Sequence, residues 1–91
     1  MHAEYKVPGG KLLVIDLETD GRQIIDARLS GDFFLEPPEA LSDIDAALEG
    51  LSVGASEAEI AAAVTAALPA GTEMFGISSE AVAVVVRRAL A

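Results

Sequence analysis

The chain has 91 residues, of which 15 are aspartate or glutamate and 6 are lysine or arginine, so its formal net charge at pH 7 is −9. This length predicts one small domain spanning residues 1–91, and a hydrophobic share of 52% excludes a disordered chain. The acidic balance excludes a free-standing nucleic-acid binder, and an anionic membrane would repel the chain. No apolar run is long enough for a membrane span or signal peptide, so we expect a cytoplasmic protein without nucleic-acid or membrane partners.

The residue types that carry metal and thiol chemistry are nearly missing from the chain. There is no cysteine, which excludes disulfides, a thiol nucleophile and thiolate metal ligands. The single histidine, His2, falls within residues 1–8, which we predict to be a flexible N-terminal tail. We therefore expect His2 to be a spectator and expect no metal site in this chain.

Two β-rich runs, "KLLVIDLE" at 11–18 and "QIIDARLS" at 23–30, predict an antiparallel hairpin. The "TDGR" between them contains Asp20-Gly21, a pair typical of tight hairpin turns because glycine adopts positive φ at low cost. Apolar and polar residues alternate along both runs, as expected of strands with one wet face. The residues predicted to face the core are Leu13, Ile15, Leu17, Ile25, Ala27 and Leu29.

The segment "GDFFLE" at 31–36 either continues this sheet or begins a third short strand, and Gly31 permits a bend at its start. In a strand, Phe33 and Phe34 point to opposite faces, so one side chain belongs to the core. The other is covered by a terminus or presented to a partner. Met74-Phe75, before Gly76, is predicted to be a loop plugged into the core.

Three helices are predicted after this strand. The first runs from about Pro38 to Leu48, the second follows a Ser56/Glu59 capping box, and the third begins at Ser78 or Ser79. The fold class is therefore α+β, with two layers. An N-terminal β-hairpin or three-strand sheet is packed on one face by about three C-terminal helices. The other sheet face, or an edge strand, is then available to a partner.

The Gly9-Gly10-Lys11 segment is not a Walker phosphate loop, because its lysine leads into a strand and Leu12 stands where serine or threonine would follow. Two interpretations remain: a plain turn before a strand, or a lysine that reaches an anion at a partner's site. Asp16, Asp20 and Asp26 are predicted to be solvated surface carboxylates. No residue set composes a self-sufficient active site, which favours an acidic interaction or accessory domain.

Several segments, in this order, resemble the C-terminal accessory domain of lipoate–protein ligases, which in some organisms is a separate small protein. The matching segments are "KVPGGKLL" at 6–13, "DGRQIIDARLSGDFFLEPPEAL" at 20–41, "LEGL" at 48–51 and "FGISSEAVAVVVRRAL" at 75–90. The combination of GGK, hairpin, GDFF, proline and helix is fairly specific, whereas the alanine-rich 56–70 is not. Met1 and the small complete domain favour the free-standing subunit over an excised domain.

The resemblance implies a non-catalytic subunit of an ATP-dependent ligase. The catalytic subunit would activate lipoate to lipoyl-AMP with ATP and magnesium, then transfer the lipoyl group to a lysine of a lipoyl acceptor domain. This chain would bind no cofactor alone and would dock as a heterodimer partner that completes the activation half-reaction. Gly9, Gly10 and Lys11 become candidates for the nucleotide side or the interface, with a plain turn and strand lysine as the alternative. Gly31, Asp32, Phe33 and Phe34 are expected to hold the hairpin's shape and the interface.

Other protein classes fit the sequence less well. Acyl carrier proteins share this size and charge but are helical bundles with serine in an Asp-Ser-Leu context, whereas Ser42 follows Leu41 here. A lipoyl acceptor domain would be nearly all-β with a lysine at a hairpin tip, whereas this tip reads Asp20-Gly21-Arg22. An iron–sulfur scaffold or sulfur-transfer protein would need cysteines. A small acidic protein-interaction module or carrier-like protein without a ligase role stays as the alternative function.

Overall fold

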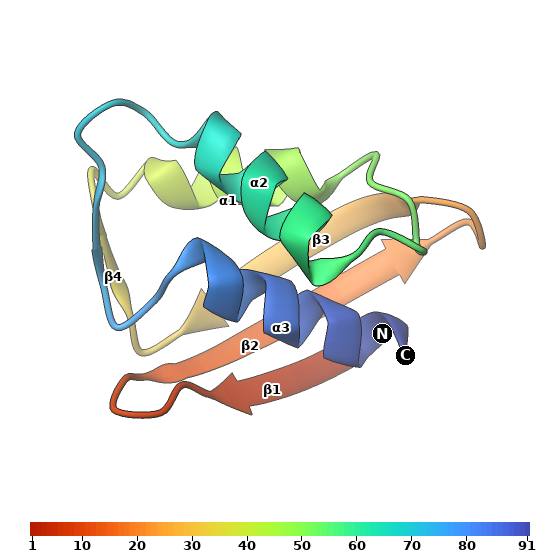
Figure 1. Ribbon diagram of the computed structural model, residues 1–91, viewed down its shortest axis with the longest axis horizontal. Coiled ribbons are helices and arrows are strands. Elements are labelled where there is room, and N and C mark those ends of the chain that lie inside the picture. The colour runs from red at the N-terminus through yellow and green to blue at the C-terminus, as the bar shows by residue number, and fades with distance from the viewer.

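A computed structural model describes all residues, 1–91. It contains a three-stranded sheet, a two-stranded ribbon and three helices (Figure 1). In chain order the elements are β1 (His2–Lys6), β2 (Leu12–Thr19), β3 (Ile24–Gly31), β4 (Phe34–Glu36), α1 (Ala40–Leu48), α2 (Glu57–Ala67), β5 (Glu73–Phe75) and α3 (Ser79–Leu90).

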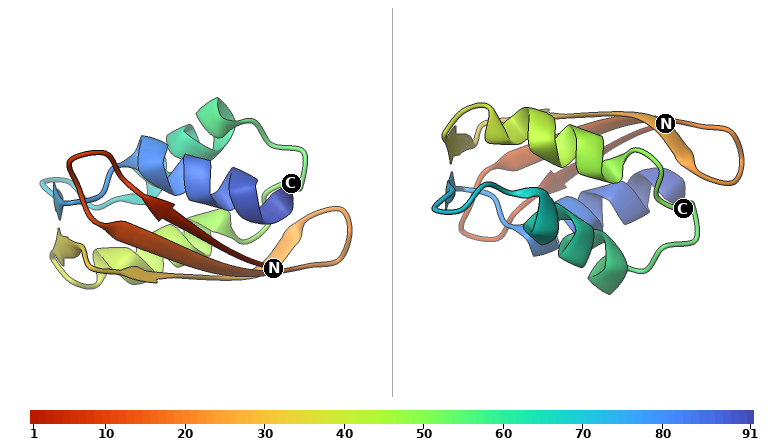
Figure 2. Two further views of the ribbon diagram at one scale, coloured as in Figure 1. Left: turned by 90° about the horizontal axis from the view of Figure 1, so that it is seen from below. Right: turned by 90° about the horizontal axis from the view of Figure 1, so that it is seen from above.

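The predicted α+β class is confirmed, with helices covering one face of an antiparallel sheet ordered β1-β2-β3. Helix α1 packs on β3, and α3 packs on β1 and β2. Helix α2 contacts α1 and α3 and lies on their far side from the sheet (Figure 2). One core of 19 buried residues fills the space between these elements, and it includes Ile15, Ile44 and Val82 at 0% exposure.

The N-terminal residues form an edge strand, so the predicted flexible tail over residues 1–8 is wrong for residues 2–6. Strand β1 pairs with β2, and His2 lies opposite Asp16. The pairing includes Met1, whose backbone carbonyl accepts a hydrogen bond from the Leu17 N–H at 2.7 Å. Half-buried Ala3 and Tyr5 pack on the core, which gives this short strand its inner face.

The hairpin between β2 and β3 is confirmed, and its turn is held by Asp20. The Asp20 carboxylate accepts hydrogen bonds from the backbone N–H groups of Gln23 and Arg22, both at 2.8 Å, and these bonds lower the pKa of that carboxyl. The register shifts between Glu18 and Thr19, which pair with Asp26 and Ile24 of β3. The extra residue between those partners is Ile25.

This bulge corrects the predicted position of Ile25. Ile24 is buried at 1% exposure, whereas Ile25 is 51% exposed and faces away from the core. Beyond the irregularity the predicted alternation holds, since Ala27 and Leu29 are buried. A bulge adds one residue to a strand and so exchanges the two faces on one side of it.

The "GDFFLE" segment does not continue the sheet. Gly31 has a φ of +144°, and a Cβ atom there would clash with the backbone carbonyl oxygen of Leu12. The Asp32 N–H donates to that same oxygen at 3.1 Å, after which the chain leaves the sheet. Strand β4 then pairs antiparallel with β5, which contains Met74 and Phe75. The predicted loop at Met74-Phe75 is therefore a strand, and only Met74 packs against the core.

The helix boundaries follow the predicted caps. Helix α1 begins at Ala40, slightly after the predicted Pro38. Helix α2 has the reciprocal Ser56/Glu59 capping box, and the Ser78 side chain accepts a hydrogen bond from the Ala81 N–H at the start of α3. None of the three helices has the length and apolar character that crossing a bilayer requires.

Side chains from the helices cover both edges of the three-stranded sheet. At the β1 edge, the Arg88 guanidinium donates to the Glu4 carbonyl at 3.2 Å and lies 4.6 Å from the centre of the Tyr5 ring. At the β3 edge, the Leu29 N–H donates to the Asp45 carboxylate at 3.0 Å. Burial raises the pKa of that carboxyl, and this hydrogen bond acts in the opposite direction. Each contact occupies one backbone group that a partner strand would otherwise pair with.

Candidate interaction surface

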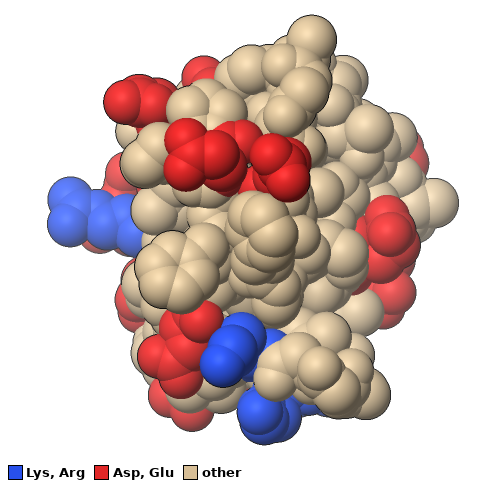
Figure 3. Space-filling view, turned by 90° about the vertical axis from the view of Figure 1, so that its left-hand side faces the viewer, with Lys and Arg blue, Asp and Glu red and all other residues tan.

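All of the residues predicted for the site lie at one end of the molecule, around the β1–β2 turn and the β4–β5 ribbon (Figure 1). Viewed from that end, uncharged surface occupies the middle, with an acidic patch above it and basic side chains below it, where further acidic side chains lie beside the basic ones (Figure 3). The structure thereby joins the two groups of residues, Gly9, Gly10 and Lys11 with Gly31, Asp32, Phe33 and Phe34.

The Gly9-Gly10-Lys11 segment is a tight turn that leads into β2. Gly9 has a φ of +69°, and the Gly10 N–H donates to the Val7 carbonyl at 2.8 Å. The Lys6 ammonium donates to the Gly10 carbonyl at 3.0 Å, which ties one lysine to the turn itself. No helix begins here, so the dipole that strengthens a phosphate-binding loop is not present.

Lys11 is the cation that this turn leaves free. Its side chain crosses the backbone of Gly76, where a Cβ atom would clash with the Lys11 Cγ and lie 3.1 Å from its Cβ. Gly76 has a φ of +79°, so both its conformation and its closeness to Lys11 require glycine. The Lys11 residue is exposed, and its ammonium has no carboxylate within 4.0 Å. Because Gly76 directly follows β5, the lysine flanks the β4–β5 ribbon.

The outer face of the ribbon carries two directly opposed pairs. Phe34 lies opposite Phe75, and the two side chains are 73% and 52% exposed. Glu36 lies opposite Glu73, and both are exposed with no cation within 4.0 Å. Side chains alternate along a strand, so these four residues share one face while Leu35 and Met74 point inward. The ribbon thus presents an aromatic pair beside an acidic pair.

Phe33 and Phe34 separate as the sequence predicted. Phe33 is half-buried and packs against the core, whereas Phe34 is exposed. A shallow apolar hollow of about 200 Å³ lies beside the ribbon, lined by Phe33, Phe34, Leu35, Pro38 and Leu41. Sequence reasoning missed Phe75, Glu36 and Glu73 as part of this surface. The available signal was the short apolar "MF" before Gly76, which was predicted to be buried.

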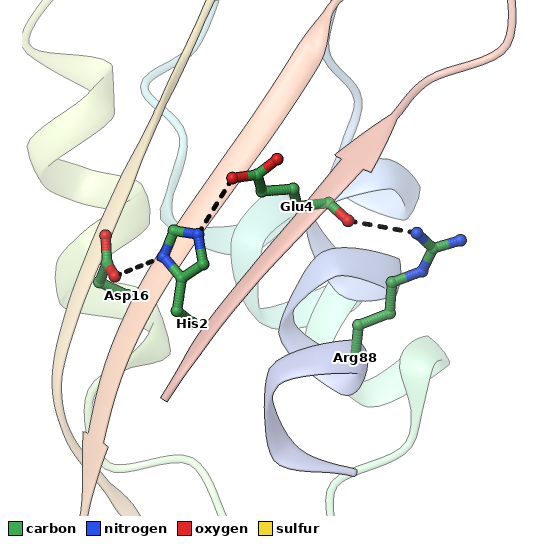
Figure 4. Close-up of polar contacts among 4 residues, drawn as sticks. All are labelled: His2, Glu4, Asp16 and Arg88. Atoms are coloured by element: carbon green, nitrogen blue, oxygen red, sulfur yellow. Dashed lines mark hydrogen bonds and ion pairs between the residues drawn. The ribbon is translucent and has the colours of Figure 1, made fainter.

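The outer face of the three-stranded sheet is a second exposed surface, and it is polar. The His2 ring bridges two carboxylates, with its Nδ1 2.7 Å from Asp16 and its Nε2 3.2 Å from Glu4 (Figure 4). Hydrogen bonds first to Asp16 and then to Glu4 raise the pKa of His2. Its role was missed because residues 1–8 were predicted to be a tail. The ring links β1 to β2, which is a structural task.

The polar side chains of the chain are either exposed or hydrogen-bonded. No three histidine, cysteine, aspartate or glutamate side chains are placed to hold a metal ion. Every buried side-chain polar atom has a hydrogen-bond partner, so none is left aimed into a cavity. The one buried polar residue, Ser79, accepts a hydrogen bond from the Thr65 hydroxyl at 2.8 Å.

Comparison with known proteins relates the chain to a lipoylation system. No family model matches it, and no curated protein sequence matches it. Among solved structures, it is similar to a chain from an archaeal lipoylation system of Thermoplasma acidophilum, which comprises a bipartite lipoate protein ligase and its E2 lipoyl domain. The TM-score is 0.67 and the sequence identity is 26%, and the match covers 96% of this chain and 98% of that one.

Proposed function

We propose that this protein is the small accessory subunit of a bipartite lipoate–protein ligase. The observation that carries the proposal is the similarity to a chain of the archaeal lipoylation system over nearly the whole of both chains, at 26% identity. The segments that resemble ligase accessory domains support the same function. In this function the chain docks on a catalytic subunit and completes its ability to form lipoyl-AMP from lipoate and ATP.

The geometry supports an accessory role over a catalytic one. The exposed chemistry at the Lys11 end consists of one free ammonium, an aromatic pair and an acidic pair. These groups do not form the nucleophile and base that covalent catalysis needs, and the chain has no cysteine and a single histidine. The catalytic subunit therefore supplies the adenylation site. Lys11 is the residue of this chain best placed to approach that site, because its ammonium is exposed and without a carboxylate partner.

A lipoyl acceptor domain is the second candidate, because the lipoylation system that contains the similar chain includes an E2 lipoyl domain. An acceptor domain is nearly all-β and carries its modified lysine at a hairpin tip. This chain instead has three helices, and its β2–β3 tip is Asp20-Gly21-Arg22. Its two lysines flank the β1–β2 turn, and Lys6 is bonded to that turn. The three helices are therefore the feature that favours the ligase subunit.

One experiment separates the two candidates. The catalytic subunit from the same organism is incubated with lipoate and ATP, with and without this protein, and pyrophosphate release and the intact mass of this protein are both measured. We expect lipoate-dependent pyrophosphate release to need this protein, whose mass stays unchanged. A mass increase of one lipoyl group on Lys11 or Lys6 would instead identify an acceptor. Equal pyrophosphate release without this protein, and no mass change, would reject both candidates.

A further inference from the structure

We infer that the outer face of the β4–β5 ribbon is the surface that docks on the catalytic subunit. The partner segment it fits has an apolar side chain with a lysine or arginine beside it. This inference rests on the proposed function, because it assigns a surface and a partner chemistry to the docking that the function requires. We call the surface formed by Phe34, Phe75, Glu36 and Glu73 the ribbon face.

The two aromatic side chains of the ribbon face are largely exposed and do not pack into the core of the chain. Phe34 and Phe75 are two of the four large hydrophobic residues exposed in the chain, and pairing places them side by side. The apolar hollow of about 200 Å³ begins at Phe34 and continues this surface. Contiguous exposed apolar surface of this kind marks interaction sites, and aromatic residues beside a pocket are typical interface anchors.

The acidic half indicates the charge of the partner. Like charges directly opposite each other across two strands destabilise the pairing. Glu36 and Glu73 are opposed in this way, and no lysine or arginine of the chain lies within 4.0 Å of either. A cation from a partner would offset this repulsion, because it could form ion pairs with both carboxylates. The ribbon face therefore selects a basic group next to an apolar one.

Lys11 gives the docking surface a direction. Its side chain crosses Gly76 just beyond Phe75, so a cation borders the aromatic pair while the glutamates lie further along the ribbon. The view of this end shows uncharged surface between an acidic patch on one side and a group of basic and acidic side chains on the other (Figure 3). When the basic group of the partner binds the two glutamates, Lys11 lies at the opposite end of the ribbon face and contacts a different part of the partner. Electrostatic complementarity of this kind sets orientation more than affinity.

The chain offers matched controls for both halves of the ribbon face. Glu18 and Asp26 form another directly opposed acidic pair, on the outer face of the three-stranded sheet. Neutralising either pair changes the net charge by the same amount, so the comparison separates a local contact from overall charge. Ile25, which is 51% exposed on β3, is the control for Phe34. All four substituted chains are first checked by thermal melting.

The test measures binding of the full chain to the catalytic subunit of the same organism by titration calorimetry, alongside lipoate-dependent pyrophosphate release. We expect Phe34→Ser to weaken binding about 30-fold, as a central interface anchor does, and Ile25→Ser to leave it within about 2-fold. We expect Glu36→Gln with Glu73→Gln to weaken binding about 3- to 10-fold at low salt and to lower its salt dependence. We expect Glu18→Gln with Asp26→Asn to have little effect.

The outcomes separate this inference from the proposed function. If wild-type protein binds and activates while the ribbon-face variants match it, the function stands and the inference is overturned. Equal losses in the ribbon-face and control variants would also overturn it, because overall charge would then explain binding. If wild-type protein neither binds nor activates, the proposed function fails first and the inference fails with it.

Discussion

The side chain of Lys11 lies across the backbone of Gly76. This contact joins the β1–β2 turn to the segment between β5 and α3. A Cβ atom on residue 76 would clash with the Lys11 Cγ, and the φ of +79° there disfavours any other residue. The contact fixes the stem of the lysine while its ammonium stays exposed. The lysine is thus positioned by the fold next to the ribbon face.

The position of Lys11 predicts a functional role without a large structural one. We expect Lys11→Ala to lower kcat/KM for lipoate activation about 10- to 150-fold, since one charged contact contributes about 1.5–3 kcal/mol. The melting temperature should change little, because the ammonium forms no ion pair within the chain. Lys6→Ala is the matched control, since it removes the other lysine of the turn. Wild-type activity in the Lys11→Ala subunit would show that the lysine is only part of the turn.

Substituting Gly76 should destabilise the fold through two separable causes. We expect Gly76→Ala to lower the free energy of unfolding by about 1–3 kcal/mol, from positive φ and from the clash with Lys11. Adding Lys11→Ala removes the Cγ and should recover part of the loss, whereas the backbone strain stays. Urea unfolding of the two single variants and the double variant measures this coupling. Strict additivity would mean that the lysine moves aside at no cost.

The two adjacent phenylalanines should behave differently. Phe33 is half-buried against the core, so we expect Phe33→Ala to lower the free energy of unfolding by about 2 kcal/mol, less than the full cost for a buried ring. Phe34 is 73% exposed, so Phe34→Ala should change it by about 0.5 kcal/mol or less. Chemical denaturation of both variants provides the comparison. Equal destabilisation by the two would contradict the observed difference in burial between Phe33 and Phe34.

The protonation of His2 should tie β1 to the sheet in a pH-dependent way. Hydrogen bonds to Asp16 and Glu4 raise the pKa of His2 in the folded chain above its unfolded value of about 6.5. The stabilisation is therefore fully present below about pH 6.5 and is lost as pH rises through the folded pKa. An NMR titration of the single imidazole should give a pKa above 6.5. In the His2→Gln variant, the part of the free energy of unfolding that falls as pH rises through the folded pKa of His2 should be absent. A folded pKa at or below 6.5 would reject the bridge.

Local signals in the sequence predicted the elements that short-range chemistry determines. The Ser56/Glu59 box and the Ser78 cap place the starts of α2 and α3, because each satisfies backbone N–H groups a few residues away. Asp20-Gly21 places the β2–β3 turn, where the Asp20 carboxylate likewise accepts hydrogen bonds from nearby backbone N–H groups. Strand alternation predicted that only one of Phe33 and Phe34 is in the core, and the burial agrees, although β4 begins at Phe34 and leaves Phe33 outside the strand.

The errors all involve partners that are distant in the sequence or a break in periodicity. Strand β1 gains its place from pairing with β2 and from Arg88 near the other end of the chain. Helices α1 and α2 separate Phe34 from Phe75 in the sequence. The residues of β4 therefore contain no signal that identifies β5 as the paired strand. A bulge after Glu18 exposed Ile25, and strict alternation cannot anticipate such a shift. These non-local contacts are also what assembles the ribbon face.

The most direct test of the accessory function is a titration of this protein into a fixed amount of the catalytic subunit from the same organism, with lipoate-dependent pyrophosphate release as the readout. We predict that the rate rises from near zero and saturates at about one accessory chain for each catalytic subunit, as expected of a tight heterodimer. A rate that is the same at every ratio, including without this protein, would contradict the proposed function.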